Sequence, residues 1–103
     1  MCSSDLYFMA GAYVIGHITV KNAEKWSEYR RSVPATIEPW KGVLVFRGRM
    51  TSVLSGSHKH NDTVVIKFPD KEAVNGWYSS PEYRALIPLR KEAAEIELIV
   101  FEE

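Results

Sequence analysis

The order in which two residue patterns follow each other is the feature that most limits the fold of this chain. Short runs rich in β-branched, aromatic and other apolar residues, typical of β-strands and in part alternating with polar residues, occur over residues 12–20, 43–47, 63–68 and 95–101. Apolar residues three or four apart, typical of helices, fill the two longer gaps at 22–41 and 70–94. The order β-α-β-β-α-β predicts an α+β, ferredoxin-like βαββαβ fold, with helices on one face of an antiparallel sheet.

Local signals mark where the helices begin and how they continue. Asn22, Asp70 and Ser80 are predicted N-caps, because their short polar side chains can accept a hydrogen bond from the first helical turn. Pro34 falls inside the first helix, where its missing N–H predicts a kink. Residues 49–54 are predicted to extend the second strand in a bent or bulged form.

Assigning alternate strand residues to opposite faces gives two surfaces of different character. The face predicted to lie beneath the helices is almost wholly apolar and carries Val14, Gly16, Ile18, Val20, Leu44, Phe46, Val64, Ile66, Phe68, Ile96, Leu98 and Val100. The other face is mixed and carries Tyr13, Ile15, His17, Thr19, Val43, Val45, Arg47, Thr63, Val65, Lys67, Glu95, Glu97, Ile99 and Phe101.

No further element of the chain is left to cover the mixed face. Its apolar members would form a patch larger than monomers usually expose. We therefore expect a homodimer that packs sheet against sheet as a dimeric α/β barrel, with the polar members of this face in a partly enclosed cavity. A monomer with a solvated sheet is the alternative.

Length, charge and cysteine content limit the class of protein. The 103 residues, 46% of them hydrophobic, suit a single globular domain, which we place at residues 11–103. Thirteen basic residues balance thirteen acidic ones, so we expect neither nucleic-acid binding through a basic surface nor a polybasic membrane anchor. The single cysteine, Cys2, the short apolar runs and the lack of a signal-peptide pattern predict a cytoplasmic protein.

Residues 1–10 differ in character from the rest of the chain. Residues 3–8 resemble the remnant of an expression tag with a viral-protease site, although Asp5 stands where that site has Asn and Met9 where it has Gln. Met9 is then a candidate natural start. We interpret residues 1–10 as a tag remnant or disordered leader.

Several short motifs, spread over residues 12–102, carry a family resemblance. They are Glu28-Tyr29-Arg30, Val33-Pro34, Phe46-Arg47-Gly48, Val53-Leu54, the run 64–69, the run Trp77-Tyr78-Ser79-Ser80-Pro81-Glu82-Tyr83, and Pro88-Leu89-Arg90. By these motifs the chain resembles the family numbered 1330 among the domains of unknown function, within the dimeric α/β-barrel superfamily. The resemblance implies a ferredoxin-like fold that dimerises into a barrel, and it implies no known activity.

Two positions depart from the pattern of that family. Arg49 stands where the family typically has a second glycine, and Ser55 stands where an acidic residue usually follows Val-Leu. If that acid transfers protons in relatives, this chain lacks it. The departure weakens any expectation of shared proton-transfer chemistry.

His17 and Arg47 are the candidates for chemistry on the mixed face. The imidazole of His17 can move a proton near neutral pH, and the alternative is a hydrogen-bonded histidine without a catalytic role. The guanidinium group of Arg47 can clamp a carboxylate or phosphate, and the alternative is an ion pair with Glu95, Glu97 or an acid of the partner copy. Together with Tyr29 on the first helix they form the predicted ligand-facing cluster, with His17 as its catalytic residue.

The helical segments carry an aromatic-rich set that suggests an apolar pocket for an aromatic or lipid-like metabolite: Trp26, Trp40, Trp77, Tyr78 and Tyr83. Trp77 and Tyr83 are predicted to contact a small organic metabolite, with Tyr83 and Arg90 bordering the mouth of the pocket, and plain core packing is the alternative. His58 and His60 have the side chains of a metal site but no third ligand at suitable spacing, so their loop is interpreted as solvated. The chain has no glycine-rich phosphate loop and no cysteine pair, and we predict no cofactor and no metal.

Two functional hypotheses follow, and the sequence leaves open whether the protein is an enzyme. In the first, a homodimer binds a small organic metabolite in the barrel cavity between sheet and helices, and cofactor-free catalysis by His17, with Arg47 as its electrostatic partner, is an extension. In the second, the protein is a non-catalytic accessory or stress-related structural module whose cavity is filled by side chains. An open cavity that reaches both His17 and Arg47 would favour the first.

Overall fold

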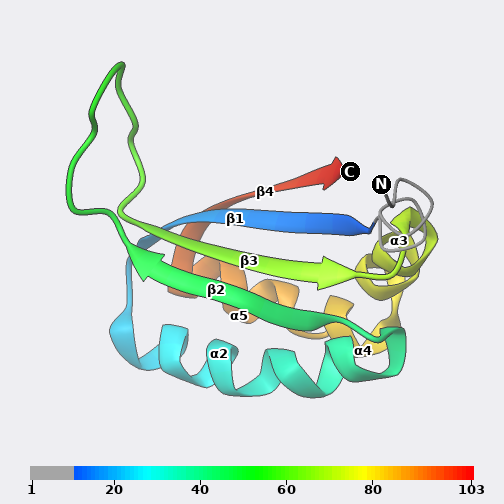
Figure 1. Cartoon of the computed structure of the whole chain (residues 1–103). Coiled ribbons are helices and arrows are strands. Elements are labelled where there is room, and N and C mark those ends of the chain that lie inside the picture. The colour runs from blue at the N-terminus through cyan, green and yellow to red at the C-terminus, as the bar shows by residue number, and fades with distance from the viewer. Residues whose placement is uncertain (1–10) are drawn as a thin grey trace, which may run out of the picture.

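The computed structural model describes residues 11–103, and the predictions for Cys2 and the leader 1–10 lie outside this range. The elements are β1 (Ala12–Val20), α2 (Ala23–Ile37), η1 (Glu38–Trp40), β2 (Val43–Arg49), β3 (Asp62–Phe68), α3 (Lys71–Ser79), α4 (Pro81–Arg84), α5 (Ile87–Ala93) and β4 (Ala94–Glu102). The strands form one antiparallel sheet in the order β2-β3-β1-β4, with the helices on one face (Figure 1). This arrangement confirms the α+β, ferredoxin-like fold, with an open sheet rather than a barrel closed within one chain.

The helices begin where their caps predict. Asn22, Asp70 and Ser80 each accept a hydrogen bond from the backbone N–H three residues further on, at donor–acceptor distances of 3.0, 2.8 and 3.2 Å. Each cap satisfies a backbone donor that has no partner within the first turn. Pro34 lies inside α2, which is continuous as far as Ile37. No helix within residues 11–103 combines the length and apolar character needed to cross a membrane.

Strand β2 is shorter than the predicted extension. It ends at Arg49, and residues 50–61 form a long loop that stands away from the body of the molecule (Figure 1). The backbone N–H of Met50 donates to the carbonyl of Asn61 at 2.7 Å, which closes the base of the loop. The prediction of a bent strand over residues 49–54 is therefore wrong beyond Arg49.

A bulge in β2 reverses the direction of the side chains that follow it. The pairing with β3 shifts between Leu44 and Phe46, so that Val45 has no partner in the ladder. Beyond the bulge, Arg47 pairs with Val64, which is buried beneath the helices. Regular alternation predicts Phe46 beneath the helices and Arg47 on the opposite face. That prediction is wrong for both, because one extra residue moves the alternation by one step.

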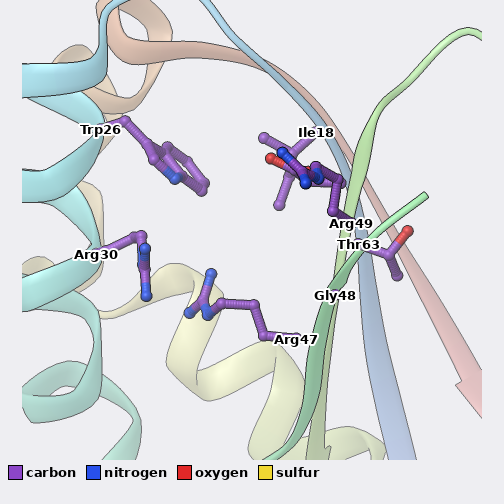
Figure 2. Close-up of a pocket in the computed structure, with 8 residues that line it drawn as sticks. Ile18, Trp26, Arg30, Arg47, Gly48, Arg49 and Thr63 are labelled. Atoms are coloured by element: carbon purple, nitrogen blue, oxygen red, sulfur yellow. The ribbon is translucent and has the colours of Figure 1, made fainter. Parts of the chain in front are cut away.

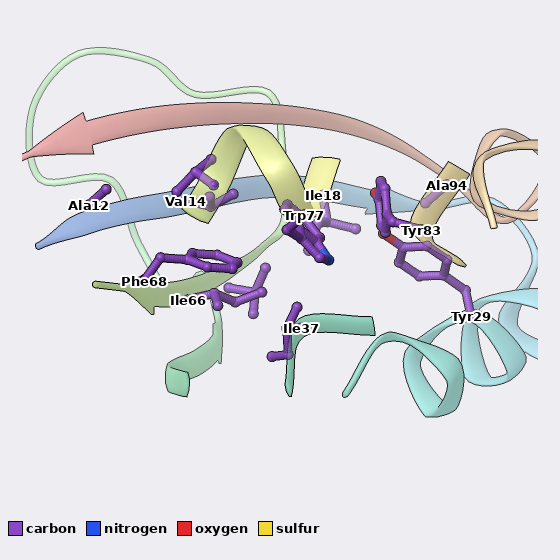
Figure 3. Close-up of a cluster of buried hydrophobic side chains, with 12 residues drawn as sticks. Ala12, Val14, Ile18, Tyr29, Ile37, Ile66, Phe68, Trp77, Tyr83 and Ala94 are labelled. Carbon is purple, nitrogen blue, oxygen red and sulfur yellow. The ribbon is translucent and has the colours of Figure 1, made fainter. Parts of the chain in front are cut away.

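The helices cover the inner face of the sheet, which holds the core (Figure 3). Trp77 from α3 packs between Phe68 of β3 and Tyr83 of α4, with ring centroids 5.4 and 4.4 Å apart. Tyr29 of α2 closes the cluster from the other side and meets Tyr83 edge-on. Large aromatic side chains thus fill most of the space between sheet and helices.

The opposite, outer face carries no helix within residues 11–103 (Figure 1). One apolar row crosses all four strands on this face, through Phe46, Val65, Ile15 and Ile99. Phe46 is 54% exposed, and its ring lies over Gly48, where a Cβ atom would come within 2.5 Å of it. An uncovered apolar row through the middle of a sheet is an unfinished packing surface.

Candidate functional site

A cleft opens between α2 and the end of β2, on the inner side of the sheet (Figure 2). It encloses about 240 Å³. The side chains and backbone around it come from β1, α2, β2 and β3: Ile18, Trp26, Arg30, Arg47, Gly48, Arg49, Asp62 and Thr63. We call this space the α2–β2 cleft.

Three arginines meet at the α2–β2 cleft. Arg47 and Arg49 are two residues apart on β2 and therefore share a face, and the Arg47 side chain extends toward Arg30 of α2 (Figure 2). Desolvation of the guanidinium group, and then the charge of Arg30, lower the pKa of Arg47. Tyr29 and Asp62 act in the opposite direction and offset this lowering only in part. In the part of the chain that the structure describes, no ion pair joins these arginines to an acid. The cleft thus concentrates positive charge in a chain with a formal net charge of +0.

A second opening shares Arg30 and Arg47 with the α2–β2 cleft. It encloses about 380 Å³ and is also lined by Ser27, Arg31, Pro34 and Leu44. Both guanidinium groups are therefore accessible to a molecule from solvent, and Arg31 adds a further positive charge beside them.

Toward the core, the α2–β2 cleft narrows to a space of about 40 Å³. Trp26, Tyr29, Val33 and Trp77 line this space together with apolar strand residues. It has room for a few water molecules at most. The interior beneath the cleft is therefore largely filled by side chains, whereas the mouth is open. A separate apolar space of about 300 Å³ lies between α3 and the strands β1 and β4.

A chain of hydrogen bonds fixes the aromatic core below the cleft. The hydroxyl oxygens of Tyr29 and Tyr83 lie 2.8 Å apart, and Nη1 of Arg90 donates to the Tyr83 oxygen at 2.8 Å. Burial, and then the neighbouring Tyr83, raise the pKa of Tyr29 well above its usual range, so its phenol stays neutral. Trp77 is buried as well, and its indole N–H donates to Thr36 at 3.0 Å. Tyr83 is 0% exposed, Arg90 is half-buried, and neither residue lines the α2–β2 cleft, so they do not border its mouth as predicted.

His17 lies on the outer face, across the sheet from Arg47. It pairs with Thr63, whereas Arg47 pairs with the next residue, Val64, and neighbouring strand residues point to opposite faces. Nδ1 of His17 is 3.4 Å from Oγ1 of Thr63, and its ring meets that of the exposed His58 edge-on at 4.9 Å. The prediction that His17 and Arg47 share one face is therefore wrong, and the bulge in β2 is the reason.

The second loop histidine is not solvated as predicted. His60 is 2% exposed, its Nδ1 lies 2.8 Å from Oγ1 of Thr19, and its Nε2 lies 3.7 Å from a carboxylate oxygen of Glu97. It holds the end of the long loop against the sheet. Across the described part of the chain, no group of three His, Cys, Asp or Glu side chains is placed to hold a metal ion.

Arg30 is a cleft residue that sequence analysis missed, whereas Trp26 belongs to the aromatic set that suggested an apolar pocket. They lie four residues apart on α2, which places a ring and a guanidinium group one turn apart on the same face. The matching signal on the strand is the spacing of Arg47 and Arg49. Neither signal reveals the cleft unless the register of β2 is known, because regular alternation places Arg47 on the opposite face of the sheet.

Solved structures show what the fold is similar to. A protein of unknown function from Rhodopseudomonas palustris gives a TM-score of 0.79 at 16% identity, over 100% of this chain and 93% of that chain. A dimeric ferredoxin-like protein of unknown function from Jannaschia gives 0.71 at 13%, over 90% and 99% of the two chains. SnoaB, a cofactor-independent oxygenase from Streptomyces nogalater, gives 0.61 at 19%, over 88% and 90%. At these identities the similarity shows the fold alone.

Sequence comparison gives the family. A comparison with curated proteins finds no match. The profile of a family described as "Domain of unknown function (DUF1330)" matches residues 11–103, which is the whole of the described domain. The match agrees with the motifs at 28–30 and 77–83. The chain therefore belongs to the DUF1330 family.

Proposed function

We propose that this protein is a homodimer whose subunits each bind a small organic molecule in the α2–β2 cleft. The observation that carries the proposal is the open mouth of the cleft, where two elements meet over a filled core without closing it. Arg47, Tyr29 and Trp77, which sequence analysis selects as ligand-binding residues, all line the cleft or its narrow inner part. The single cysteine suits a reducing compartment, and we place the protein in the cytoplasm.

The outer face supports the dimer. Its apolar row through Phe46 and Ile99 would be covered if a second copy packed sheet against sheet, which would complete a dimeric α/β barrel. The Jannaschia protein with this fold is described as dimeric. A formal net charge of +0 also means that two copies meet without overall repulsion.

The dimer is tested by light scattering coupled to gel filtration. The wild-type protein should elute at about twice the chain mass of 11.7 kDa. Ile99→Glu places a charge in the apolar row and should give the monomer mass, while circular dichroism remains unchanged. Ala35→Glu adds the same charge to the exposed side of α2 and should leave the mass at that of a dimer. A monomer mass for the wild type at micromolar concentration would refute the dimer.

Catalysis by His17 with Arg47 as its electrostatic partner is not part of the proposal. The two side chains are on opposite faces of the sheet, so one ligand in the α2–β2 cleft cannot contact both. If the copies pack sheet against sheet, His17 belongs to the subunit interface. SnoaB shows that the fold accommodates cofactor-independent oxygenation, but this chain and SnoaB are only 19% identical.

Ligand binding is tested by NMR with a set of small fragments that includes neutral, cationic and anionic members. Binding in the α2–β2 cleft should shift the backbone amide signals of Gly48 and Thr63. The amides of Asn75 and Val100, which line a separate apolar space beside α3, serve as controls and should not move.

The alternative is a non-catalytic accessory or stress-related structural module. The observation that favours it is the filled interior, where only about 40 Å³ remains beneath the cleft. A fragment screen in which no compound shifts the Gly48 or Thr63 amide would favour this alternative and refute ligand binding in the cleft.

A further inference from the structure

We infer that the ligand of the α2–β2 cleft is a small carboxylate with a flat apolar body, whose carboxylate group lies between Arg30 and Arg47. The inference rests on the proposed function of the cleft and adds the chemical class of the ligand. It assigns the binding of the carboxylate to two residues of different elements, one on α2 and one on β2.

The argument begins with unbalanced charge. The Arg30 and Arg47 guanidinium groups approach each other across the cleft, and like charges at close range are destabilising. Asp62 is the single acidic residue around the cleft and its adjoining opening, against Arg30, Arg31, Arg47 and Arg49. An anion between the two guanidinium groups would turn this repulsion into two attractive contacts.

The donors of the two arginines are available for such an anion. Within residues 11–103, neither Arg30 nor Arg47 takes part in a side-chain hydrogen bond or ion pair. Each guanidinium group presents planar donors that match the two oxygens of a carboxylate. Arg47 is exposed overall, but neighbouring atoms desolvate its guanidinium group in part, so its contact with an anion would be less screened by water than that of a fully solvated side chain.

The cleft residues beyond the arginines favour an apolar group for the part of the ligand that lies outside its carboxylate. Trp26 extends from α2 toward the buried side chain of Ile18, on the side of the cleft away from Arg47 (Figure 2). The indole is held in place because it stacks on Tyr29, with ring centroids 5.4 Å apart and planes inclined by 27°. These groups offer apolar surface and a ring edge, which favour an organic body over a fully hydrated inorganic anion.

Size limits the ligand to a single small group. The cleft of about 240 Å³ is below the range of roughly 300–1,000 Å³ that holds drug-sized ligands. The inner space of about 40 Å³ does not admit a ring or a long chain. A one-ring carboxylate, with its ring against Trp26 and its carboxylate toward Arg30 and Arg47, suits these dimensions.

The test uses benzoate, its neutral counterpart benzamide, and inorganic phosphate, each titrated into the wild-type protein by calorimetry and NMR. Benzoate should bind and shift the Gly48 and Thr63 amides, and benzamide should bind at least about tenfold more weakly, because it lacks the charge. Arg30→Gln and Arg47→Gln should each weaken benzoate binding about tenfold or more and leave benzamide binding unchanged. Arg47→Lys, which keeps the charge but loses the planar pair of donors, should be intermediate.

Arg84→Gln is the matched control, since it removes the same charge from α4, whose residues do not line the cleft. It should leave benzoate affinity unchanged. Equal affinity for benzoate and benzamide, or benzoate affinity unaffected by Arg47→Gln, would overturn the inference while the cleft remained a binding site. Phosphate binding at the same arginines without benzoate binding would also overturn it. If neither benzoate nor any neutral fragment moved the cleft amides, the proposed function itself would fail.

Discussion

The same four strands build both faces of the sheet, but the helices within residues 11–103 cover the inner face and leave the outer face uncovered. The inner face is largely covered by aromatic side chains of three helices, and it opens where α2 meets β2 and, separately, in an apolar space beside α3. The outer face keeps an apolar row from Phe46 to Ile99 without any helix above it in the described part of the chain. In the proposed function, the inner face carries the core and the ligand site, and the outer face binds the second copy.

One residue determines which chemistry belongs to which face. With the extra residue Val45 in β2, Arg47 points into the cleft and Phe46 joins the outer row. Without a shift in alternation, the aromatic ring would lie inside and the charge outside. The bulge therefore supplies the cleft with its guanidinium group and the outer face with apolar surface in a single step.

The largest expected effect on the free energy of unfolding comes from removing a buried aromatic ring from the inner face. Trp77→Ala removes a buried ring that packs against Phe68 and Tyr83, and should lower the free energy of unfolding by about 3–5 kcal/mol. Phe46→Ala removes a ring from the outer face, and its effect should shrink as the protein is diluted toward monomer. Urea unfolding at several protein concentrations measures both. The contrast between the faces breaks down if Phe46→Ala remains as costly as Trp77→Ala at the lowest concentration.

A smaller effect is expected from the buried hydroxyl chain. Tyr83→Phe leaves the Tyr29 hydroxyl and Nη1 of Arg90 without their partner, and should lower the free energy of unfolding by about 1–3 kcal/mol. Tyr13→Phe is the matched change on the outer face and should cost less than about 0.5 kcal/mol. Urea unfolding of the two variants decides the matter, and equal losses would show that the hydroxyl chain contributes nothing specific.

The raised pKa of Tyr29 predicts how stability changes with alkaline pH. Burial favours the neutral phenol in the folded state, whereas the unfolded phenol ionises near pH 10. The stabilisation is therefore complete below about pH 10 and is lost above it, at up to about 1.4 kcal/mol per pH unit for this one group. Urea unfolding between pH 8 and 11 should show a shallower decline for Tyr29→Phe than for the wild type. Parallel declines would mean that Tyr29 ionises as easily in the folded protein.

The sequence predicts the parts of this molecule that depend on local signals. Asn22 and Ser80 cap helices because a short polar side chain suffices, and the order of strands and helices follows from periodicity alone. The failures are at Phe46 and Arg47, because a bulge leaves no mark in the apolar pattern when Val45 is itself apolar. Arg30 is missed for a related reason, since its significance depends on which way Arg47 points.

Deletion of Val45, the bulge residue, tests whether the bulge itself is needed to keep the two faces distinct. This deletion should join Leu44, on the inner face, directly to Phe46, on the outer face, so that β2 becomes regular without moving any other residue to the opposite side. We expect a change of less than about 1 kcal/mol in the free energy of unfolding, an unchanged dimer mass, and retained benzoate binding. Deleting Val65 from β3 is the contrasting variant.

The two deletions differ because β3 has no spare residue. Loss of Val65 forces half of a central strand to exchange its inner and outer side chains, and should prevent stable folding. Urea unfolding, light scattering and benzoate titration of both variants measure the difference. If deletion of Val45 were as damaging as deletion of Val65, the bulge would be part of the packing itself. Retained folding and binding would instead show that only the register on each side of Val45 matters, because that register alone holds Arg47 in the cleft and Phe46 on the outer face.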